Sequence, residues 1–192
     1  MPDAAHEPVY PIFLKLAGRQ TLVVGAGSVA ERKVASLVEA GALVTVVAPT
    51  ATPQLTRLAA EGMIEWHARR FRETDLDGAW LVIASTSDPE AQMKVAEGAR
   101  ARHIFVVAVD DPANSSAYSG AIMKRPPFTV AISSAGTAPA LTRLLRELLE
   151  YILPDDDWVE HARALRAQWM TAGTPMSERF GELVRELAAR RK

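Results

Sequence analysis

The segment Gly25-Ala26-Gly27-Ser28-Val29-Ala30 has the residue types and spacing of a phosphate-binding loop. It fits the pattern G-x-G-x-x-G/A. In that pattern the first glycine permits a tight turn, the second lets the backbone approach a pyrophosphate, and the small third residue lets a helix pack on a strand. The amino terminus of the following helix would supply N–H donors to the phosphates. We therefore expect a bound dinucleotide, the alternative being a tight strand-to-helix turn that binds no ligand.

The type of dinucleotide is not readable from this loop. The residue that reads the ribose usually ends the second strand, which here finishes Val47-Ala48-Pro49-Thr50, without the acid typical of NAD sites or the arginine typical of NADP sites. Pro49 and Thr50 would have to meet the ribose through backbone and hydroxyl. A later strand ends at Ser85 and Thr86, whose small side chains suit close passage of a cofactor, while Asp88 before Pro89 is equally consistent with a helix cap.

Asp110 and Asp111 follow the next predicted strand, at the same edge of the sheet. A carboxylate at the end of an apolar strand can have a raised pKa and exchange protons with a substrate. The sequence Asp-Asp-Pro is also ordinary turn chemistry. Both interpretations stay open on spacing alone.

Charge is unevenly distributed along the second half of the chain. The segment Pro112–Arg146 contains four bases and no acid, whereas Glu147–Asp157 contains five acids and no base. We interpret the basic segment, with Lys124 and Arg125 in it, as a site for a polyanion. Four bases without interleaved aromatic residues are a small footprint for nucleic acid, so a small polycarboxylate fits better. Within the segment, Ser133-Ser134-Ala135-Gly136-Thr137 precedes a predicted helix and could cap it or hold an anionic group.

Hydrophobic periodicity predicts the elements that position these residues. Short apolar runs alternate with amphipathic stretches, as in repeated strand–helix–strand units, so we expect an α/β fold with a Rossmann-like, doubly wound parallel sheet. A small mixed α+β segment and a helical carboxyl-terminal part would follow. The predicted strands are 21–24, 43–47, 63–67, 79–84, 104–109 and 128–133, and the predicted helices are 29–40, 52–61, 89–102, one ending near 153, 157–171 and 176–191.

Composition sets limits on the chemistry. The chain has 192 residues, 48% of them apolar, and 22 Lys and Arg against 23 Asp and Glu, so it can bury a core and has no global attraction to nucleic acid. The absence of cysteine excludes disulfides, thiolate metal sites and cysteine nucleophiles, and the four histidines lack metal-ligand spacing. No targeting segment is visible and no apolar run approaches the roughly 20 residues of a membrane helix. We expect a cytoplasmic protein with no membrane partner and no resident metal.

Several segments, taken in order, resemble the precorrin-2 dehydrogenase/sirohydrochlorin ferrochelatase family of sirohaem synthesis. The resemblance covers nearly the whole chain and is to the amino-terminal module of sirohaem synthases in a stand-alone form. It is carried by Tyr10–Leu14, by Leu22–Lys33 with its Ala-Glu-Arg-Lys end, by Ala40-Gly41-Ala42, by Val109-Asp110 and by Val130–Leu141 with its Ile-Ser-Ser-Ala-Gly-Thr-Ala-Pro block.

The resemblance implies an NAD-binding domain over residues 1–112, a dimerisation and substrate-binding segment over 113–150 and a helical domain over 151–192. It implies NAD-dependent removal of two electrons from precorrin-2, giving sirohydrochlorin, with Asp110 as the catalytic carboxylate and Ser134 at the tetrapyrrole site. The substrate has eight carboxylates, which gives Lys124 and Arg125 a purpose. The resemblance also implies a homodimer.

The chain departs from the family pattern at Val107, where asparagine is common, and at Ser116-Ala117-Tyr118-Ser119-Gly120. It ends without the methyltransferase domain of some members, so we expect another protein to make precorrin-2. Alternative functions are a bifunctional dehydrogenase and ferrochelatase, a dinucleotide-sensing module without catalysis, and the dinucleotide domain of a larger reductase.

Overall fold

The structure is a computed structural model that describes residues 9–152 and 156–190. The chain divides into two compact units. The first unit comprises Met1–Gly120 and Ser133–Ala138, and the second comprises Ala121–Ile132 and Pro139–Lys192. The functional boundaries expected after residues 112 and 150 stay a prediction, because compactness does not define functional parts.

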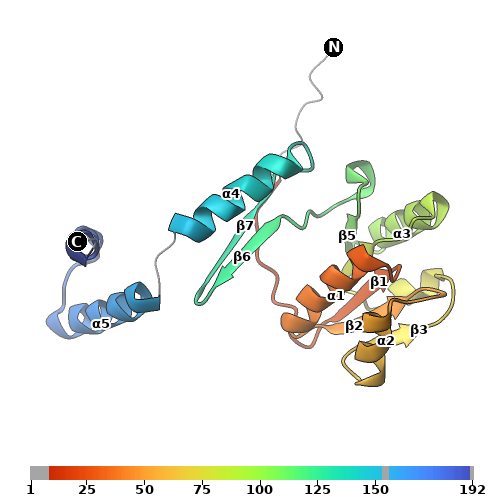
Figure 1. Cartoon of the computed structure of the whole chain (residues 1–192), viewed down its shortest axis with the longest axis horizontal. Helices are drawn as coiled ribbons and strands as arrows, with labels where there is room; N and C mark the ends of the chain where they lie inside the picture. Colours follow the sequence, from red (N-terminus) through yellow and green to blue (C-terminus); the bar gives the residue numbers. More distant parts are fainter. Residues whose placement is uncertain (1–8, 153–155, 191–192) are drawn as a thin grey trace, which may run out of the picture. The chain divides into compact units, whose positions relative to one another are not determined.

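The first unit is built on a five-stranded parallel sheet in the order β3-β2-β1-β4-β5 (Figure 1). Its strands are β1 (Gln20–Val24), β2 (Leu43–Val47), β3 (Glu65–His67), β4 (Leu81–Ala84) and β5 (Phe105–Ala108). From β1 the chain builds outward to β2 and β3, then returns to add β4 and β5 on the other side of β1. The switch point of the sheet therefore lies between β1 and β4, where ligands bind in such folds. The predicted doubly wound α/β fold is confirmed.

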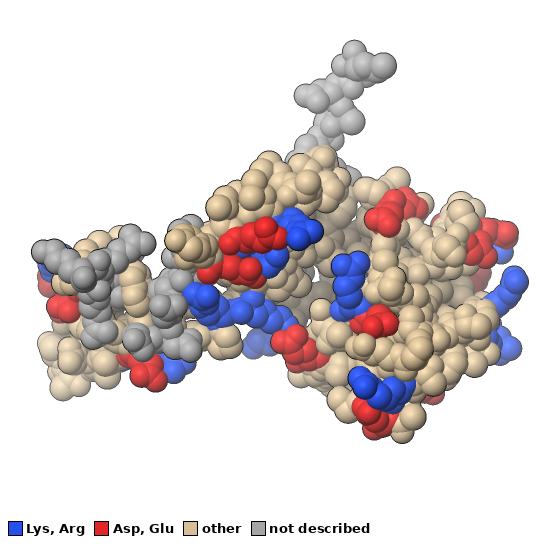
Figure 2. All heavy atoms as spheres, in the orientation of Figure 1, with Lys and Arg blue, Asp and Glu red and all other residues tan. Residues whose placement is uncertain are grey.

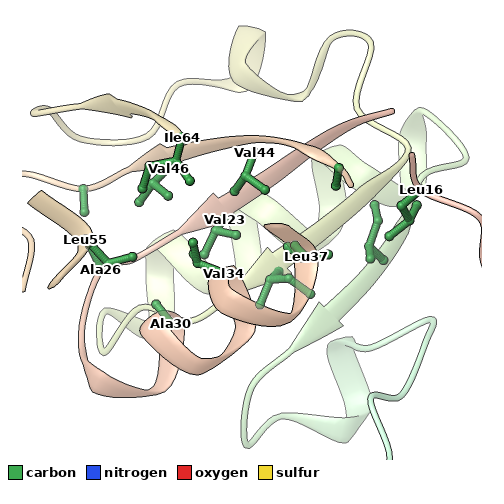
Figure 3. Close-up of a cluster of buried hydrophobic side chains, with 14 residues drawn as sticks. Leu16, Val23, Ala26, Ala30, Val34, Leu37, Val44, Val46, Leu55 and Ile64 are labelled. Atoms are coloured by element: carbon green, nitrogen blue, oxygen red, sulfur yellow. The ribbon is translucent and has the colours of Figure 1, made fainter. Parts of the chain in front are cut away.

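Helices cover both faces of this sheet. They are α1 (Ser28–Glu39), α2 (Pro53–Ala60) and α3 (Pro89–Ala101), with short 3₁₀ turns η1 (Glu73–Leu76) and η2 (Pro112–Asn114). Val23 of β1 points to the face that α1 and α2 cover, in the cluster drawn in Figure 3. Its neighbours Leu22 and Val24 point to the face that α3 and η1 cover. Because successive residues of β1 are buried on opposite faces, the strand is a continuous apolar run instead of an alternating one.

The second unit combines a hairpin with helices. Strands β6 (Ala121–Arg125) and β7 (Phe128–Ile132) pair antiparallel, and α4 (Pro139–Ile152) packs on them. Helices α5 (Asp156–Ala172) and α6 (Met176–Arg190) pack together, with Trp169 buried and its indole N–H donating to Glu182 Oε2 at 2.7 Å. The small mixed segment and the helical end are as predicted, although β6 was not expected. In the described ranges, no helix is both long enough and apolar enough to cross a membrane.

Candidate functional site

A cavity of about 640 Å³ opens at the carboxyl ends of the central strands of the first unit. Its walls come from the loops after β1, β2, β4 and β5, which is where the switch point of the sheet lies. Nine residues expected at the site line it. They are Gly25, Gly27, Ser28, Val29, Pro49, Thr50, Ser85, Thr86 and Asp110. Ala30 does not line the cavity, because it is fully buried where α1 packs on the sheet, as the small third position of the loop requires.

Gly25 is a glycine because of the fold itself. Its backbone has φ = 105°, in the region that side chains disfavour, and a Cβ at this position would lie 2.2 Å from the carbonyl oxygen of Ser85. The loop after β1 and the loop after β4 therefore lie too close together for any side chain at Gly25. This contact fixes the floor of the cavity.

Gly27 is different, because nothing in the described protein requires a glycine there. Its backbone is extended with φ = −83°, and a Cβ would have no neighbour within 4 Å. Gly27 is also the N-cap of α1, so no side chain caps the N–H groups of the first turn. A bare backbone beside open N–H donors on a cavity wall is the arrangement that a pyrophosphate needs.

The cavity has little charge of its own. Of the residues that line it, only Asp110 is ionisable, and none is a lysine or an arginine. A dinucleotide would therefore be held by backbone N–H groups and hydroxyls, not by cations. Asp88, which the sequence left between two roles, is a helix cap, because its Oδ1 accepts from the N–H groups of Glu90 and Ala91 at 3.0 and 3.2 Å.

Asp110 is held in a strained conformation at the edge of the cavity. Its φ of 58° is left-handed, which is uncommon outside glycine although aspartate tolerates it better than most residues. The preceding residue, Val109, is fixed on both sides. Its N–H donates to Ala84 O at 2.8 Å, and its carbonyl accepts from the side chain of Gln92 at 2.9 Å. Strain maintained by surrounding bonds is typical of functional positions.

Asp111 has a separate, structural task. Its carboxylate accepts from the backbone N–H of Asn114 at 3.3 Å and from the Asn114 side chain at 2.7 Å, which caps η2. The two adjacent aspartates thus differ, since Asp111 is committed to the turn and Asp110 lines the cavity. The turn interpretation holds for Asp111, and proton exchange by Asp110 stays a prediction.

Two further residues that support this site, without lining the cavity, were missed from the sequence. Gln92 is buried in the row that α3 turns toward the sheet, with Val95, Ala96 and Ala99. A single amide at helical spacing in an apolar row could have indicated a buried partner. The other missed residue is Lys33 of α1, whose Nζ donates to Ser119 Oγ at 2.5 Å. Burial lowers the pKa of Lys33, with a smaller contribution from Arg32, while the carboxylate of Asp110 opposes this shift.

The segment that carries Ser119 is fastened along β5. The hydroxyl of Ser115 accepts from the Ala108 N–H at 3.0 Å, and that of Ser116 accepts from the Val106 N–H at 2.9 Å. The N–H groups of Ser116 and Ala117 in turn donate to Val106 O. The region in which the chain departs from the family pattern is therefore ordered by its serines.

Ser134 lies in a tight turn before α4. Its hydroxyl accepts from the Ala138 N–H at 3.0 Å, and its carbonyl accepts from the Thr137 N–H. Gly136 in this turn has φ = 82° and packs on Pro112, where a Cβ would come within 3.2 Å of the proline ring. The turn therefore lies next to the segment after Asp110. The capping role is observed, and a role for Ser134 in substrate binding stays a prediction.

Two of the four bases of the segment Pro112–Arg146 are paired with acids in the structure. Arg143 donates to Glu147 at 2.8 Å, and Arg146 pairs with Glu150, so two of the four bases are matched by acids one helical turn away in α4. Acidic and basic side chains accordingly lie side by side over α4 (Figure 2). The separation of bases from acids along the chain is therefore not kept in space over α4, and the polyanion site stays a prediction. Lys124 and Arg125 lie on β6 in the second unit, where Arg125 donates to Glu150 O at 3.4 Å.

No group of three or more His, Asp or Glu side chains in the described residues is arranged to hold a metal ion. The cavity wall combines small apolar residues with hydroxyl side chains, and this lining suits a dinucleotide.

Comparison with known proteins agrees with the glycine loop. A family model described as "Putative NAD(P)-binding" matches residues 12–121. The chain belongs to this NAD(P)-binding family. The prediction of a nicotinamide dinucleotide cofactor is thereby confirmed.

Relatives of this NAD(P)-binding protein include siroheme synthases. It is 50% identical over 144 residues to siroheme synthase 3 of Aeromonas hydrophila, which is 75% of this chain and 31% of the relative. It is 46% identical over 171 residues to the siroheme synthase of Salmonella schwarzengrund, which is 88% of this chain and 37% of the relative. The chain thus spans about a third of the length of these curated relatives.

Among solved structures, the fold is similar to that of SirC, a precorrin-2 dehydrogenase. The TM-score is 0.74 at 24% identity, covering 92% of this chain and 88% of the other. The match confirms the expected fold class, with its small mixed segment and its helical end.

Proposed function

We propose that this protein catalyses the NAD-dependent dehydrogenation of precorrin-2 to sirohydrochlorin. The observation that carries the proposal is Asp110, the ionisable residue that lines the cavity beside the glycine loop, held there in a left-handed conformation. The names of the siroheme synthase relatives and of the precorrin-2 dehydrogenase with the same fold indicate the substrate.

In this reaction the substrate loses two electrons and two protons overall. NAD bound along the Gly25–Ala30 loop supplies the acceptor for a hydride. Asp110 accepts the remaining proton, as a carboxylate adjacent to the reacting carbon can. Its position at the cavity edge, with Val109 fixed by Gln92, gives that carboxylate a defined direction.

We propose NAD in preference to NADP. The 2′-phosphate of NADP needs a cationic partner, usually an arginine at the end of the second strand. Pro49, Thr50 and Ala51 occupy that place, and no lysine or arginine is among the residues that line the cavity. Titration with NADH and with NADPH, followed by the fluorescence of the bound coenzyme, measures the preference between the two. A Thr50→Arg variant should raise the affinity for NADPH relative to NADH.

We propose that Ser134, Lys124 and Arg125 bind carboxylates of the tetrapyrrole. Ser134 lies in a turn packed on Pro112, two residues after Asp110. The bases of β6 are in the second unit. Equal loss of activity in Lys124→Met and in an exposed control such as Lys15→Met would argue against this assignment.

We further propose that the protein is a homodimer that associates through the second unit. Helix α4 packs on the hairpin yet exposes Leu141, Leu144, Leu148 and Tyr151, and β7 exposes Phe128. So many large apolar side chains on one helix are typical of an interaction surface. The cytoplasmic location expected from the sequence stays a prediction.

The decisive experiment supplies purified protein with precorrin-2 and NAD and follows NADH and sirohydrochlorin together. We expect the two products in equal amounts. Asp110→Ala separates this enzyme from a dinucleotide sensor, since the variant should still bind NAD but form no product. Absence of NADH with wild-type protein, while an authentic precorrin-2 dehydrogenase turns over in parallel, would overturn the proposal.

A further inference from the structure

Lys33 has a position that the cofactor site does not use. It lies on α1, one turn beyond Ala30, and its ammonium group donates to Ser119. It is half-buried and close enough to Asp110 for the carboxylate to act on it, yet it is not among the residues that line the cofactor cavity. Lys33 thus lies on the helix whose first residues line the cavity, outside the space that the dinucleotide would fill.

The ammonium of Lys33 retains binding capacity. An ammonium has three donors, and Ser119 receives one of them. No carboxylate in the described part of the chain lies within ion-pair distance of Lys33, in contrast to Lys94 on α3, which pairs with Glu90 at 2.6 Å. Keeping a half-buried cation without a partner ion costs free energy, and an incoming anion would recover it.

The support around Lys33 is ordered. Its partner Ser119 ends the segment that Ser115 and Ser116 fasten to β5. Helix α1, which carries Lys33, follows the glycine loop and is held on the sheet by the buried side chains of Val34 and Leu37. A cation between two fixed elements is oriented before a ligand arrives, which lowers the entropic cost of binding.

We propose that Lys33, presented by Ser119, is a substrate-specificity residue that binds one carboxylate of the tetrapyrrole beside Asp110. This inference rests on the proposed function for the identity of the polycarboxylate. It places one acidic side chain of the macrocycle at Lys33, with the reacting carbon then facing Asp110 and the cofactor cavity.

The test measures binding of sirohydrochlorin by fluorescence titration, and precorrin-2 turnover, for Lys33→Gln, Lys33→Arg and Ser119→Ala. Lys94→Met serves as a control for removing a lysine from a helix. We expect Lys33→Gln to raise the Kd for sirohydrochlorin and the KM for precorrin-2 about tenfold, as loss of one charge-assisted hydrogen bond does. Lys33→Arg should keep most of the affinity, and the NAD affinity should be unchanged in every variant.

Salt separates a charge contact from a packing effect. The difference between wild type and Lys33→Gln should shrink as ionic strength rises, because the contact is screened. If Ser119→Ala weakens binding as much as Lys33→Gln and the loss is independent of salt, Lys33 only anchors the segment and the inference is wrong. The inference is also wrong if Lys33→Gln lowers kcat with an unchanged KM, or weakens NAD binding.

The outcome is distinguishable from failure of the proposed function. If wild-type protein binds sirohydrochlorin but forms no NADH from precorrin-2, the dehydrogenase proposal fails, and the Kd values of the Lys33 variants still decide this inference. If wild-type protein turns over and Lys33→Gln matches it in Kd and KM, the inference fails alone.

Discussion

Gly25 and Gly27 are two residues apart in one loop, but only Gly25 is required by the structure of the protein itself. Gly25 has a left-handed backbone and meets Ser85 O, so the protein itself excludes a side chain there. Gly27 has an ordinary backbone and open space around it. Substitution by alanine should therefore lower the stability of the fold at Gly25 and weaken dinucleotide binding at Gly27.

We expect Gly25→Ala to lower the free energy of unfolding by about 3 kcal/mol or more, since it combines backbone strain with an atomic overlap. Gly27→Ala should leave the free energy of unfolding nearly unchanged and raise the Kd for NADH about tenfold or more, because the added methyl group occupies the place of the pyrophosphate. Urea denaturation and NADH titration measure the two quantities. Loss of stability in Gly27→Ala without loss of affinity would contradict this interpretation of the loop.

Replacement of Asp110 tests its role in proton transfer. Asp110→Asn keeps the shape and tolerates the left-handed backbone, so the fold and the NADH affinity should persist. We expect kcat to fall about 100-fold or more, as for removal of a general base. Asp111→Asn is the matched control, and it should mainly weaken the cap of η2.

At the residue scale, sequence reasoning was successful where the pattern is local. Except for Ala30, the predicted residues of the glycine loop, the strand ends at Pro49, Thr50, Ser85 and Thr86, and Asp110 line one cavity, and their binding and catalytic roles stay predictions. Gln92 and Lys33 were missed because their partners, Val109 and Ser119, are 17 and 86 residues away in the chain. No local pattern encodes a contact at that separation.

At the scale of elements, one side chain joins α3 to the end of β5. Gln92→Leu removes the donor to Val109 O and leaves a buried carbonyl without a partner, which should cost about 1–3 kcal/mol of unfolding free energy. Because Val109 precedes Asp110, kcat should fall as well. Gln54→Leu, at an exposed position of α2, is the control for the same chemical change. Equal effects of both substitutions would refute the coupling.

A salt bridge between Arg69 and Asp75 joins the segment after the edge strand β3 to η1. The guanidinium donates to both carboxylate oxygens at 2.6 and 2.8 Å, and these hydrogen bonds lower the pKa of Asp75. A lowered pKa means that the folded state favours the ionised form. The stabilisation is therefore fully present above the ordinary carboxyl pKa of 3.8 and is lost as the pH falls through the lower folded value.

We expect Asp75→Asn to cost about 1 kcal/mol at pH 7, a modest value because solvent reaches the guanidinium. The difference from wild type should shrink as the pH falls below the ordinary carboxyl pKa of 3.8, because the unfolded state then binds a proton that the folded state excludes. Urea denaturation over this pH range is the measurement. Asp77→Asn, which removes a more exposed partner of Arg102, should have a smaller effect.

Two features were not predicted because they depend on which residues meet in space. Strand β6 has the mixed sequence Ala-Ile-Met-Lys-Arg, and it is a strand because β7 pairs with it, so its own pattern is weak. The charge separation along the chain does not persist in space, because a helix brings residues four apart together and so pairs Arg143 with Glu147. The long amphipathic stretches, in contrast, were predicted to within a few residues.

At the scale of the whole molecule, the proposed dimer is the property that the sequence pattern constrains least. A charge placed among exposed apolar residues of α4, as in Leu144→Glu, should convert a dimer to a monomer when measured by light scattering during gel filtration. Met63→Glu changes an equally exposed apolar residue of the first unit and should leave the mass unchanged. A wild-type monomer at micromolar concentration would contradict the proposed assembly.

The serines that fasten the 115–117 segment have a consequence for solubility. Strand β5 is the last strand on its side of the sheet, and such a strand offers unpaired backbone groups to any passing chain. The N–H and C=O groups of Val106 and Ala108 are instead occupied by Ser115, Ser116 and Ala117. The same hydroxyls that order the approach to the site thus seal the border of the sheet against templated strand addition.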